Sequence, residues 1–145
     1  MNRRKFLHTA ACAAPAALIF AQPAAAQLAG GVDELAREAG FALEIPLAKA
    51  VALTGSLLHI ARENLPSLEF AEIIKFLPGA ERMIFQAANV VAGALPKSMA
   101  GLGAVLEKVE LPAETSEALR GFVLDYLGRN GGRKVVALLR KAWRN

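Results

Sequence analysis

The chain has 145 residues, a net charge of +4 and a single cysteine, and 54% of its residues are hydrophobic. Arg3, Arg4 and Lys5 supply three of the positive charges, so residues 27–145 carry a net charge of only +1. This small excess removes the main argument for binding to nucleic acid, because nucleic-acid-binding domains usually present a strongly basic surface. The part after residue 26 is long enough to form one domain with its own hydrophobic core.

The first 26 residues resemble a twin-arginine export signal. Two adjacent arginines are followed, after one spacer, by a phenylalanine and a leucine, and a soft apolar run then covers residues 10–21. The run ends in small residues that are typical of a signal-peptide cleavage site. The export signal consists of Arg3, Arg4, Phe6 and Leu7, and the cleavage region of Ala24, Ala26 and Gln27. The sequence therefore predicts a signal peptide over residues 1–26, transient contact with the twin-arginine export machinery, and a periplasmic location for residues 27–145.

The only cysteine, Cys12, lies inside this predicted signal. Lipidation of Cys12 would need an apolar run before the cysteine, whereas most of the run follows it. Residues 27–145 contain no cysteine, so we expect neither disulfide bonds nor thiol chemistry there. Retention of residues 1–26 as an uncleaved membrane anchor is the alternative to cleavage.

The rest of the chain reads as helices and turns, because no segment of useful length alternates polar and apolar residues with period two. Proline and serine residues mark helix starts, and glycines mark stops. The expected segments are 32–39, with Gly40 as its stop, 47–64, 68–76, 80–94, 98–109, 112–127 and 133–143. Glycines weaken the two middle segments. We therefore expect a single all-α domain over residues 27–145, a compact bundle of about five to six helices.

An internal similarity relates two parts of this domain. A shift of 66 positions aligns residues 44–77 with residues 110–143 without a gap, and nine residue pairs are identical. The aligned pairs include prolines that start the long helices and glycines in their middle, Gly55 and Gly121. Two similar helical hairpins are therefore expected, either from an ancient duplication or by chance similarity of amphipathic sequences. The paired glycines would let the two long helices approach each other closely where they cross, or glycine is merely tolerated at these positions.

Residues 47–64 carry the residue types of a hydrolytic triad on one predicted polar face, namely Ser56, His59 and Glu63. Side chains at such spacing on one helix should point outward over solvent, without oxyanion donors or a pocket. We therefore interpret them as a solvated face with a weak pairing of His59 and Glu63, and a small hydrolase is the least favoured function. We expect no catalytic residues, no metal site and no cofactor.

The last predicted helix is strongly basic on one side. Between Arg129 and Asn145 there are six basic residues and no acidic ones, whereas residues 27–128 carry a net charge of −5. The residues proposed for contact with lipid or a partner are Arg133, Lys134, Arg140, Lys141, Trp143 and Arg144. A basic amphipathic helix with a tryptophan near its end is typical of an element that binds anionic lipid. The alternative is an ordinary terminal helix whose apolar face packs into the core, and the sequence leaves both interpretations open.

Two stretches resemble a known family. They are residues 57–64 with 70–74 and 77–79, and residues 111–112 with 122–127, 131–132 and 135–139. Together they are similar to the VcgC/VcgE-type family of uncharacterised bacterial exported proteins. The resemblance implies an all-helical envelope domain, and it implies no catalytic or binding residues.

These observations predict a small non-enzymatic module that binds a ligand or a periplasmic protein through an apolar groove between helices or through a helical face. The alternative is a peripheral membrane protein whose basic C-terminal helix contacts an anionic membrane surface. Salt should weaken the second kind of binding most, because clustered Lys and Arg side chains act through screened electrostatics.

Overall fold

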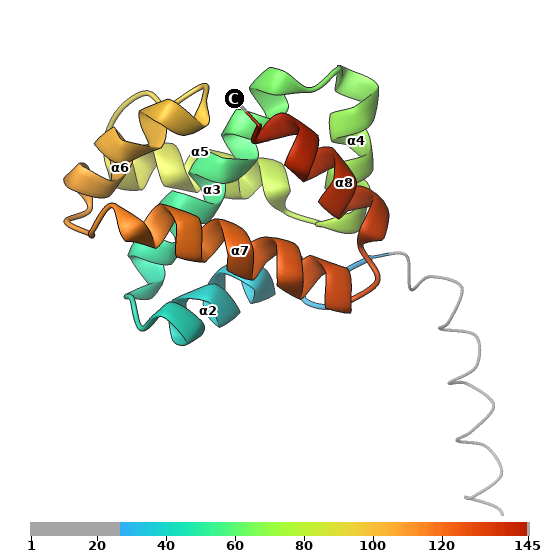
Figure 1. Ribbon diagram of the computed structural model, residues 1–145, viewed down its shortest axis with the longest axis horizontal. Helices are drawn as coiled ribbons and strands as arrows, with labels where there is room; N and C mark the ends of the chain where they lie inside the picture. The colour runs from blue at the N-terminus through green and yellow to red at the C-terminus, as the bar shows by residue number, and fades with distance from the viewer. Residues whose placement is uncertain (1–26, 145) are drawn as a thin grey trace, which may run out of the picture.

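A computed structural model describes residues 27–144, and these residues form seven α-helices and one 3₁₀ helix, without a β-strand (Figure 1). The elements are α2 (Gly31–Leu43), α3 (Leu47–Asn64), α4 (Ser67–Phe76), α5 (Ala80–Val91), η2 (Met99–Gly101), α6 (Leu102–Lys108), α7 (Glu114–Arg129) and α8 (Arg133–Ala142). The predicted all-α class is confirmed. The predictions for Arg3, Arg4, Phe6, Leu7, Cys12, Ala24 and Ala26 lie outside the described residues.

The expected number of five to six helices is too low, because both glycine-containing middle segments are helical. α5 ends at Val91, where Ala92 takes a left-handed conformation with a φ of 59°. The segment expected over residues 98–109 begins as η2 and continues as α6. Gly101 and Gly103 therefore lie within a helical stretch and do not interrupt it.

The predicted helix stop at Gly40 is also wrong. α2 continues to Leu43, and Glu44 ends it in the left-handed region with a φ of 55°. Gly40 is buried, and a Cβ there would lie 3.2 Å from the carbonyl oxygen of Ile45 and 3.4 Å from the Cβ of Ala50. The small size of Gly40 thus allows the turn into α3 to fold back on α2.

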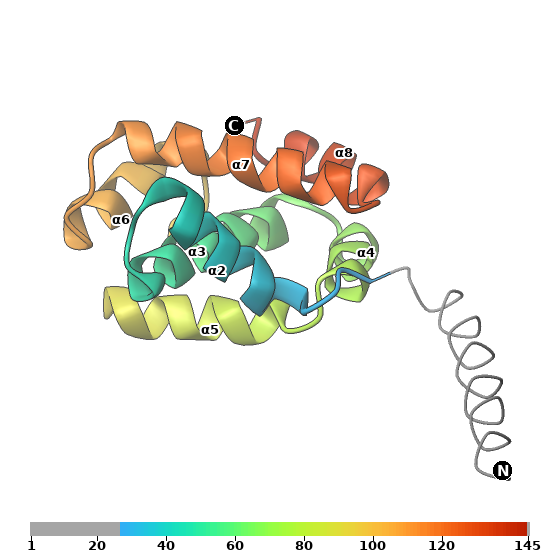
Figure 2. The ribbon, with the colours of Figure 1, turned by 90° about the horizontal axis from the view of Figure 1, so that it is seen from below.

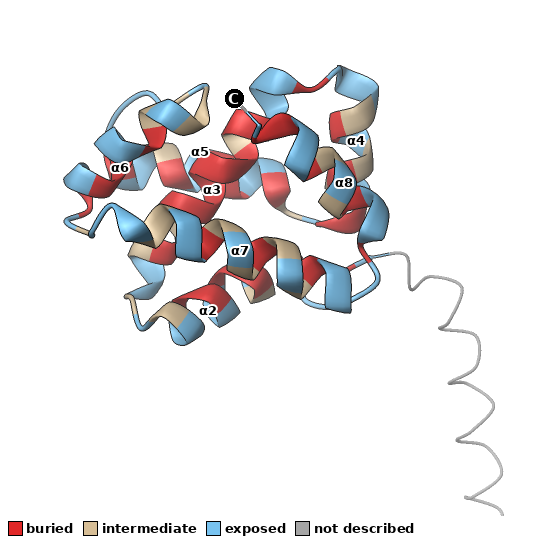
Figure 3. Cartoon of the chain, viewed as in Figure 1, coloured by how far each residue is buried: buried red, intermediate tan, exposed pale blue. Residues whose placement is uncertain are grey.

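The central helix of the fold is α3. Figure 2 shows it between α5 on one side and α7 with α8 on the other, and it contacts these helices as well as α2 and α6. Most of its middle residues are buried (Figure 3). Apolar area removed from water stabilises a fold by roughly 25 cal/mol per Å². Because so many residues of α3 are buried, this helix forms the centre of the hydrophobic core.

Gly55 of α3 lies in a tightly packed contact with α5. A Cβ at this position would lie 2.4 Å from the Cβ of Ala87 and 2.6 Å from the carbonyl oxygen of Met83, both on α5. Only a residue without a side chain allows α3 and α5 to come this close. The sequence predicts that Gly55 and Gly121 let the two long helices approach each other, and this prediction is wrong: Gly55 packs against α5, and no heavy atom of the described neighbouring elements lies within 4 Å of a Cβ built on Gly121.

None of the helices within residues 27–144 is, alone, long and apolar enough to cross a membrane. The pair α2 and α3 passes such a test only when taken together, and the two helices meet at an angle of 119°.

Candidate functional site

The last helix, α8, is docked on the body of the protein by its apolar face. Val135, Leu139, Ala142 and Trp143 are buried, and Trp143 retains only 2% of its exposure. The indole Nε1–H of Trp143 donates a hydrogen bond of 2.9 Å to the carbonyl oxygen of Leu57 in α3. The fold thus buries the apolar face that insertion into a lipid bilayer would use.

Two of the basic residues on α8 form ion pairs with α4. Lys134 lies 3.0 Å from Glu72, and Lys141 lies 2.9 Å from Glu69. The hydrogen bond from Lys134, with its charge, holds the pKa of Glu72 below the ordinary value. These two lysines therefore have carboxylate partners on α4.

The arginines of the same helix behave differently. Arg133, Arg140 and Arg144 are exposed, and none of them has a carboxylate within 4.0 Å among residues 27–144. Guanidinium groups present several N–H donors in a fixed plane that matches carboxylates and phosphates. These three arginines are the part of the predicted basic face that is available to a partner.

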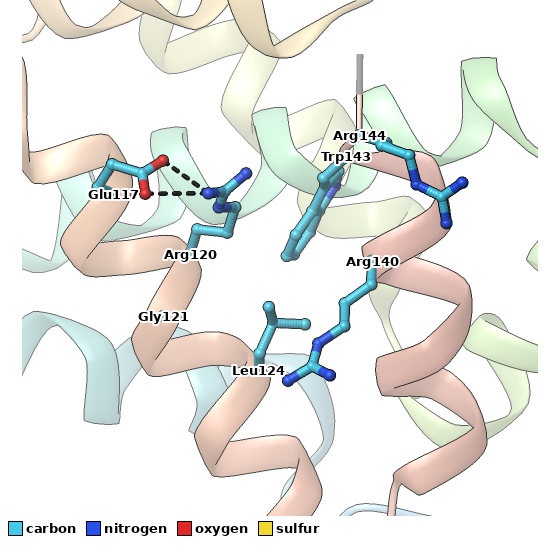
Figure 4. Close-up of a pocket in the computed structure, with 7 residues that line it drawn as sticks. All are labelled: Glu117, Arg120, Gly121, Leu124, Arg140, Trp143 and Arg144. Carbon is cyan, nitrogen blue, oxygen red and sulfur yellow. Dashed lines mark hydrogen bonds and ion pairs between the residues drawn. The ribbon is translucent and has the colours of Figure 1, made fainter.

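Arg140 and Arg144 border a cavity of about 440 Å³ between α7 and α8 (Figure 4). Its lining consists of Glu117, Arg120, Gly121, Leu124, Arg140, Trp143 and Arg144. Figure 4 shows the Arg120 side chain extending from α7 toward Trp143, while Arg140 reaches from α8 toward Leu124. The cavity therefore has an apolar floor and arginines from both helices around it.

A second cavity of about 420 Å³ continues this one, because it shares Gly121, Leu124 and Arg140 with it. Its other lining residues are Asp125, Gly128, Arg129 and Val136. We call the two cavities together the α7–α8 groove. The α7–α8 groove runs between the two last helices and has glycines, not side chains, at two positions on α7.

Both ends of α7 also carry local ion pairs. Arg120 bonds Glu117 at 2.9 Å, and Arg129 bonds Asp125 at 2.9 Å. Within the α7–α8 groove, Arg140 and Arg144 are thus the cations without a carboxylate neighbour in the described part of the chain.

The residue types of the predicted triad do not form a catalytic arrangement. Ser56 is completely buried, and its hydroxyl donates a 2.7 Å hydrogen bond to the carbonyl oxygen of Ala52, one turn earlier in α3. The prediction that Ser56 faces solvent is therefore wrong, because α3 is surrounded by other helices on this side too. A hydroxyl enclosed in this way cannot reach a substrate.

His59 is half-buried and neighbours Arg62, whose guanidinium lies 3.1 Å from the ring Nδ1. Burial, and after it the positive charge of Arg62, lowers the pKa of His59 from its ordinary value. The expected pairing of His59 with Glu63 is wrong, because the carboxylate of Glu63 lies nearest Lys97, at 4.0 Å, and His59 contacts Arg62. Residues 27–144 hold no group of three or more His, Cys, Asp or Glu side chains arranged for a metal ion.

The sequence indicates Arg140, Trp143 and Arg144 as candidate contact residues. It does not indicate Arg120 or Leu124, nor that Gly121 and Gly128 line a groove. One sequence signal for the groove is the spacing of the two glycines. They are seven residues apart, which places them on one side of α7. It identifies a common side but not which helix faces that side.

No family model, no curated protein and no solved structure matches this chain.

Proposed function

We propose that this chain is a non-enzymatic binding module of the bacterial envelope, and that the α7–α8 groove is its binding surface. The observation that carries the proposal is the contrast within α8. Its apolar face packs against the body of the protein, and its two lysines pair with carboxylates of α4. Arg140 and Arg144, in contrast, have no ion partner in the described part of the chain and border an open groove. Binding sites are typically concave surfaces with a few converging polar or charged groups, and the groove has this form.

Export by the twin-arginine route is part of this proposal. Leu28 is buried, and its N–H donates a 2.8 Å hydrogen bond to the carbonyl oxygen of Phe76. A cut before Gln27 would therefore leave the first core residue and its hydrogen bond in place. A folded protein of this kind suits a route that carries folded substrates.

The export proposal is tested by the double variant Arg3→Lys/Arg4→Lys, with Arg37→Lys as a control outside the signal. We expect the double variant to remain unprocessed in the cytoplasm, while the control reaches the periplasmic fraction at the level of the unaltered protein. Equal processing and export of the double variant would contradict the twin-arginine interpretation.

We further propose that the segments 44–77 and 110–143 are related helical hairpins. The nine identical pairs and the similar order of a long helix, a turn and a shorter helix support this relation. The long helices now differ in position, since α3 lies in the centre and α7 at the surface. A surface position frees one side of α7 for the groove.

The binding surface is tested with a photo-crosslinking amino acid at Glu117, which lines the α7–α8 groove, in cells that export the full chain. Glu107 on α6 provides the matched control, because it is also an exposed glutamate and lies outside the groove lining. We expect adducts from position 117 that are absent at position 107. Identical adducts at both positions, or none at 117, would contradict the proposed surface.

Peripheral membrane association is the second candidate function, because Arg133, Arg140 and Arg144 are exposed on one helix. With the apolar face of α8 buried, the contact with lipid would be electrostatic alone. The test is flotation with neutral and anionic vesicles at low and high salt. Salt-sensitive binding to anionic vesicles alone, lost when Arg140, Lys141 and Arg144 become Gln, would favour the membrane over a protein partner.

A further inference from the structure

We propose that the α7–α8 groove takes an acidic segment of a partner protein, with its carboxylates on Arg120, Arg140 and Arg144 and its backbone along the glycine side of α7. This inference rests on the proposed function, that the groove is the binding surface, and it names the chemistry of the partner.

The charge of the groove selects an anion. Arg140 and Arg144 have no carboxylate within 4.0 Å in the described part of the chain, and both are exposed and line the groove. The partner of Arg120, Glu117, has a side chain that is 69% exposed. A carboxylate from outside can therefore bind Arg140 and Arg144 directly and compete with Glu117 for Arg120. Planar guanidinium groups bind carboxylates through paired hydrogen bonds.

The shape of the groove selects an extended chain. Gly121 and Gly128 are seven residues apart on α7, which corresponds to about 10 Å along the helix at 1.5 Å per residue. An extended chain covers this length with about three residues at 3.3–3.6 Å each. Alternate residues of such a chain point to the same side, so two carboxylates would face the arginines.

The glycines themselves support this interpretation. Glycine within a helix is unfavourable relative to alanine, and Gly55 is required because α5 approaches it. Gly121 has no such neighbour, since a Cβ built there would meet no heavy atom of the described neighbouring elements within 4 Å, and for Gly128 a side-chain atom of Val136 lies 3.9 Å away. Packing of the described helices therefore does not require either glycine, whereas the approach of a backbone to α7 does.

A flat membrane surface fits these observations less well. The groove floor, formed by Leu124 and Trp143, lies between two helices, where a planar surface cannot follow. The apolar face of α8, which would anchor the helix in lipid, is buried against α3 and α4. A protein segment can enter between the helices and place its carboxylates on both.

The test uses a fluorescently labelled octaglutamate peptide and the protein purified after expression of the full chain, with binding followed by fluorescence anisotropy. Loss of charged hydrogen bonds in Arg140→Gln/Arg144→Gln should weaken binding by about tenfold or more. The control Lys49→Gln/Lys97→Gln removes the same charge outside the groove lining and should change the affinity by less than about twofold, as expected for screened charges away from the contact.

A steric pair of variants tests the groove without changing its charge. Gly121→Leu places a bulky side chain in the groove and should weaken binding by about tenfold, which corresponds to about 1.4 kcal/mol. Gly103→Leu on α6 also has no described neighbour within 4 Å and should bind like the unaltered protein. Circular dichroism establishes that each variant is folded.

Equal losses in the two charge pairs, or in the two glycine variants, would overturn the proposal. Binding to phosphatidylglycerol vesicles without binding to octaglutamate would also overturn it, in favour of the membrane. Groove-specific crosslinks at position 117 combined with no binding of octaglutamate would reject the acidic segment and leave the proposed binding surface intact.

Discussion

The sharpest prediction about the fold concerns the two glycines that the internal similarity aligns, Gly55 and Gly121. In Gly55→Ala the new Cβ would lie 2.4 Å from the Cβ of Ala87 and 2.6 Å from the carbonyl oxygen of Met83, so α5 must move. Overpacking of this kind costs about 1–3 kcal/mol, and we expect the upper end because a backbone atom is involved. Alanine regains about 1 kcal/mol of helix propensity. The net loss in the free energy of unfolding is therefore about 2 kcal/mol.

The same substitution at Gly121 should have the opposite sign. No atom of the neighbouring elements within residues 27–144 lies near the new methyl group, so only the propensity gain of about 1 kcal/mol remains. For a domain of this size, 1 kcal/mol corresponds to roughly 4 °C in Tm. We therefore expect Gly55→Ala to melt about 8 °C below the unaltered protein and Gly121→Ala about 4 °C above it, by the same conversion.

The assay is urea denaturation, followed by circular dichroism and by the fluorescence of Trp143, together with thermal melts. Coincident transitions from the two signals would justify a two-state analysis. Equal effects of the two substitutions, or stabilisation by Gly55→Ala, would refute the close packing of α3 against α5.

Three further predictions concern buried polar groups. Trp143→Phe removes the hydrogen bond to Leu57 and leaves a small cavity, so it should lower the free energy of unfolding by about 2 kcal/mol. An unchanged midpoint of urea denaturation would mean that α8 is not docked. The hydroxyl of Thr54 is buried without a hydrogen-bond partner among the described residues, so Thr54→Val should raise the stability by roughly 1 kcal/mol, and a clear loss in the same urea assay would show that the hydroxyl is hydrogen-bonded. The pKa of His59 is lower in the fold than in the unfolded chain, so the unfolded chain binds the proton more readily and stability falls as the pH drops through the ordinary histidine range near 6.5. Thermal melts at pH 7.5 and 5.5 should show this fall, and His59→Gln should reduce it; the same fall in the variant would assign it to other groups.

The helix starts are the most predictable part of the fold, because they depend on local backbone chemistry. Pro46 lies directly before α3, and Ser67 begins α4, within one residue of the predicted starts. The predicted capping role of Ser67 is wrong, because the N-cap of α4 is Pro66 and no side chain caps this helix. The helix ends are less predictable. α2 passes through Gly40, and the residue that ends it, Glu44, is not a glycine, because tertiary packing of the turn overrides local preference.

A helical wheel also cannot predict how completely α3 is buried. The wheel places Ser56 on a solvated face, but α3 is covered by helices on most sides, and the serine hydroxyl finds its hydrogen-bond acceptor within its own helix. A wheel assumes one apolar and one polar side, and a central helix has no solvent side over much of its length.

For the candidate site, the sequence indicates the basic residues of α8 and leaves two interpretations of that helix open. The contacts of Trp143, Lys134 and Lys141 favour the docked helix, and they depend on residues of α3 and α4 that lie far away in the sequence. The sequence does not predict Arg120 and Gly121 as neighbours of Arg140, because no local pattern specifies which helices lie side by side.

The most direct test of the groove is the nitrogen–proton NMR spectrum of the isotopically labelled protein during titration with octaglutamate. Backbone amides of Gly121 and Gly128 and the guanidinium Nε–H of Arg140 should shift together and saturate, while the amides of Gly55 and Gly103 stay in place. Shifts concentrated at Gly55 or Gly103, or spread evenly over the basic residues of the protein, would contradict a binding site between α7 and α8.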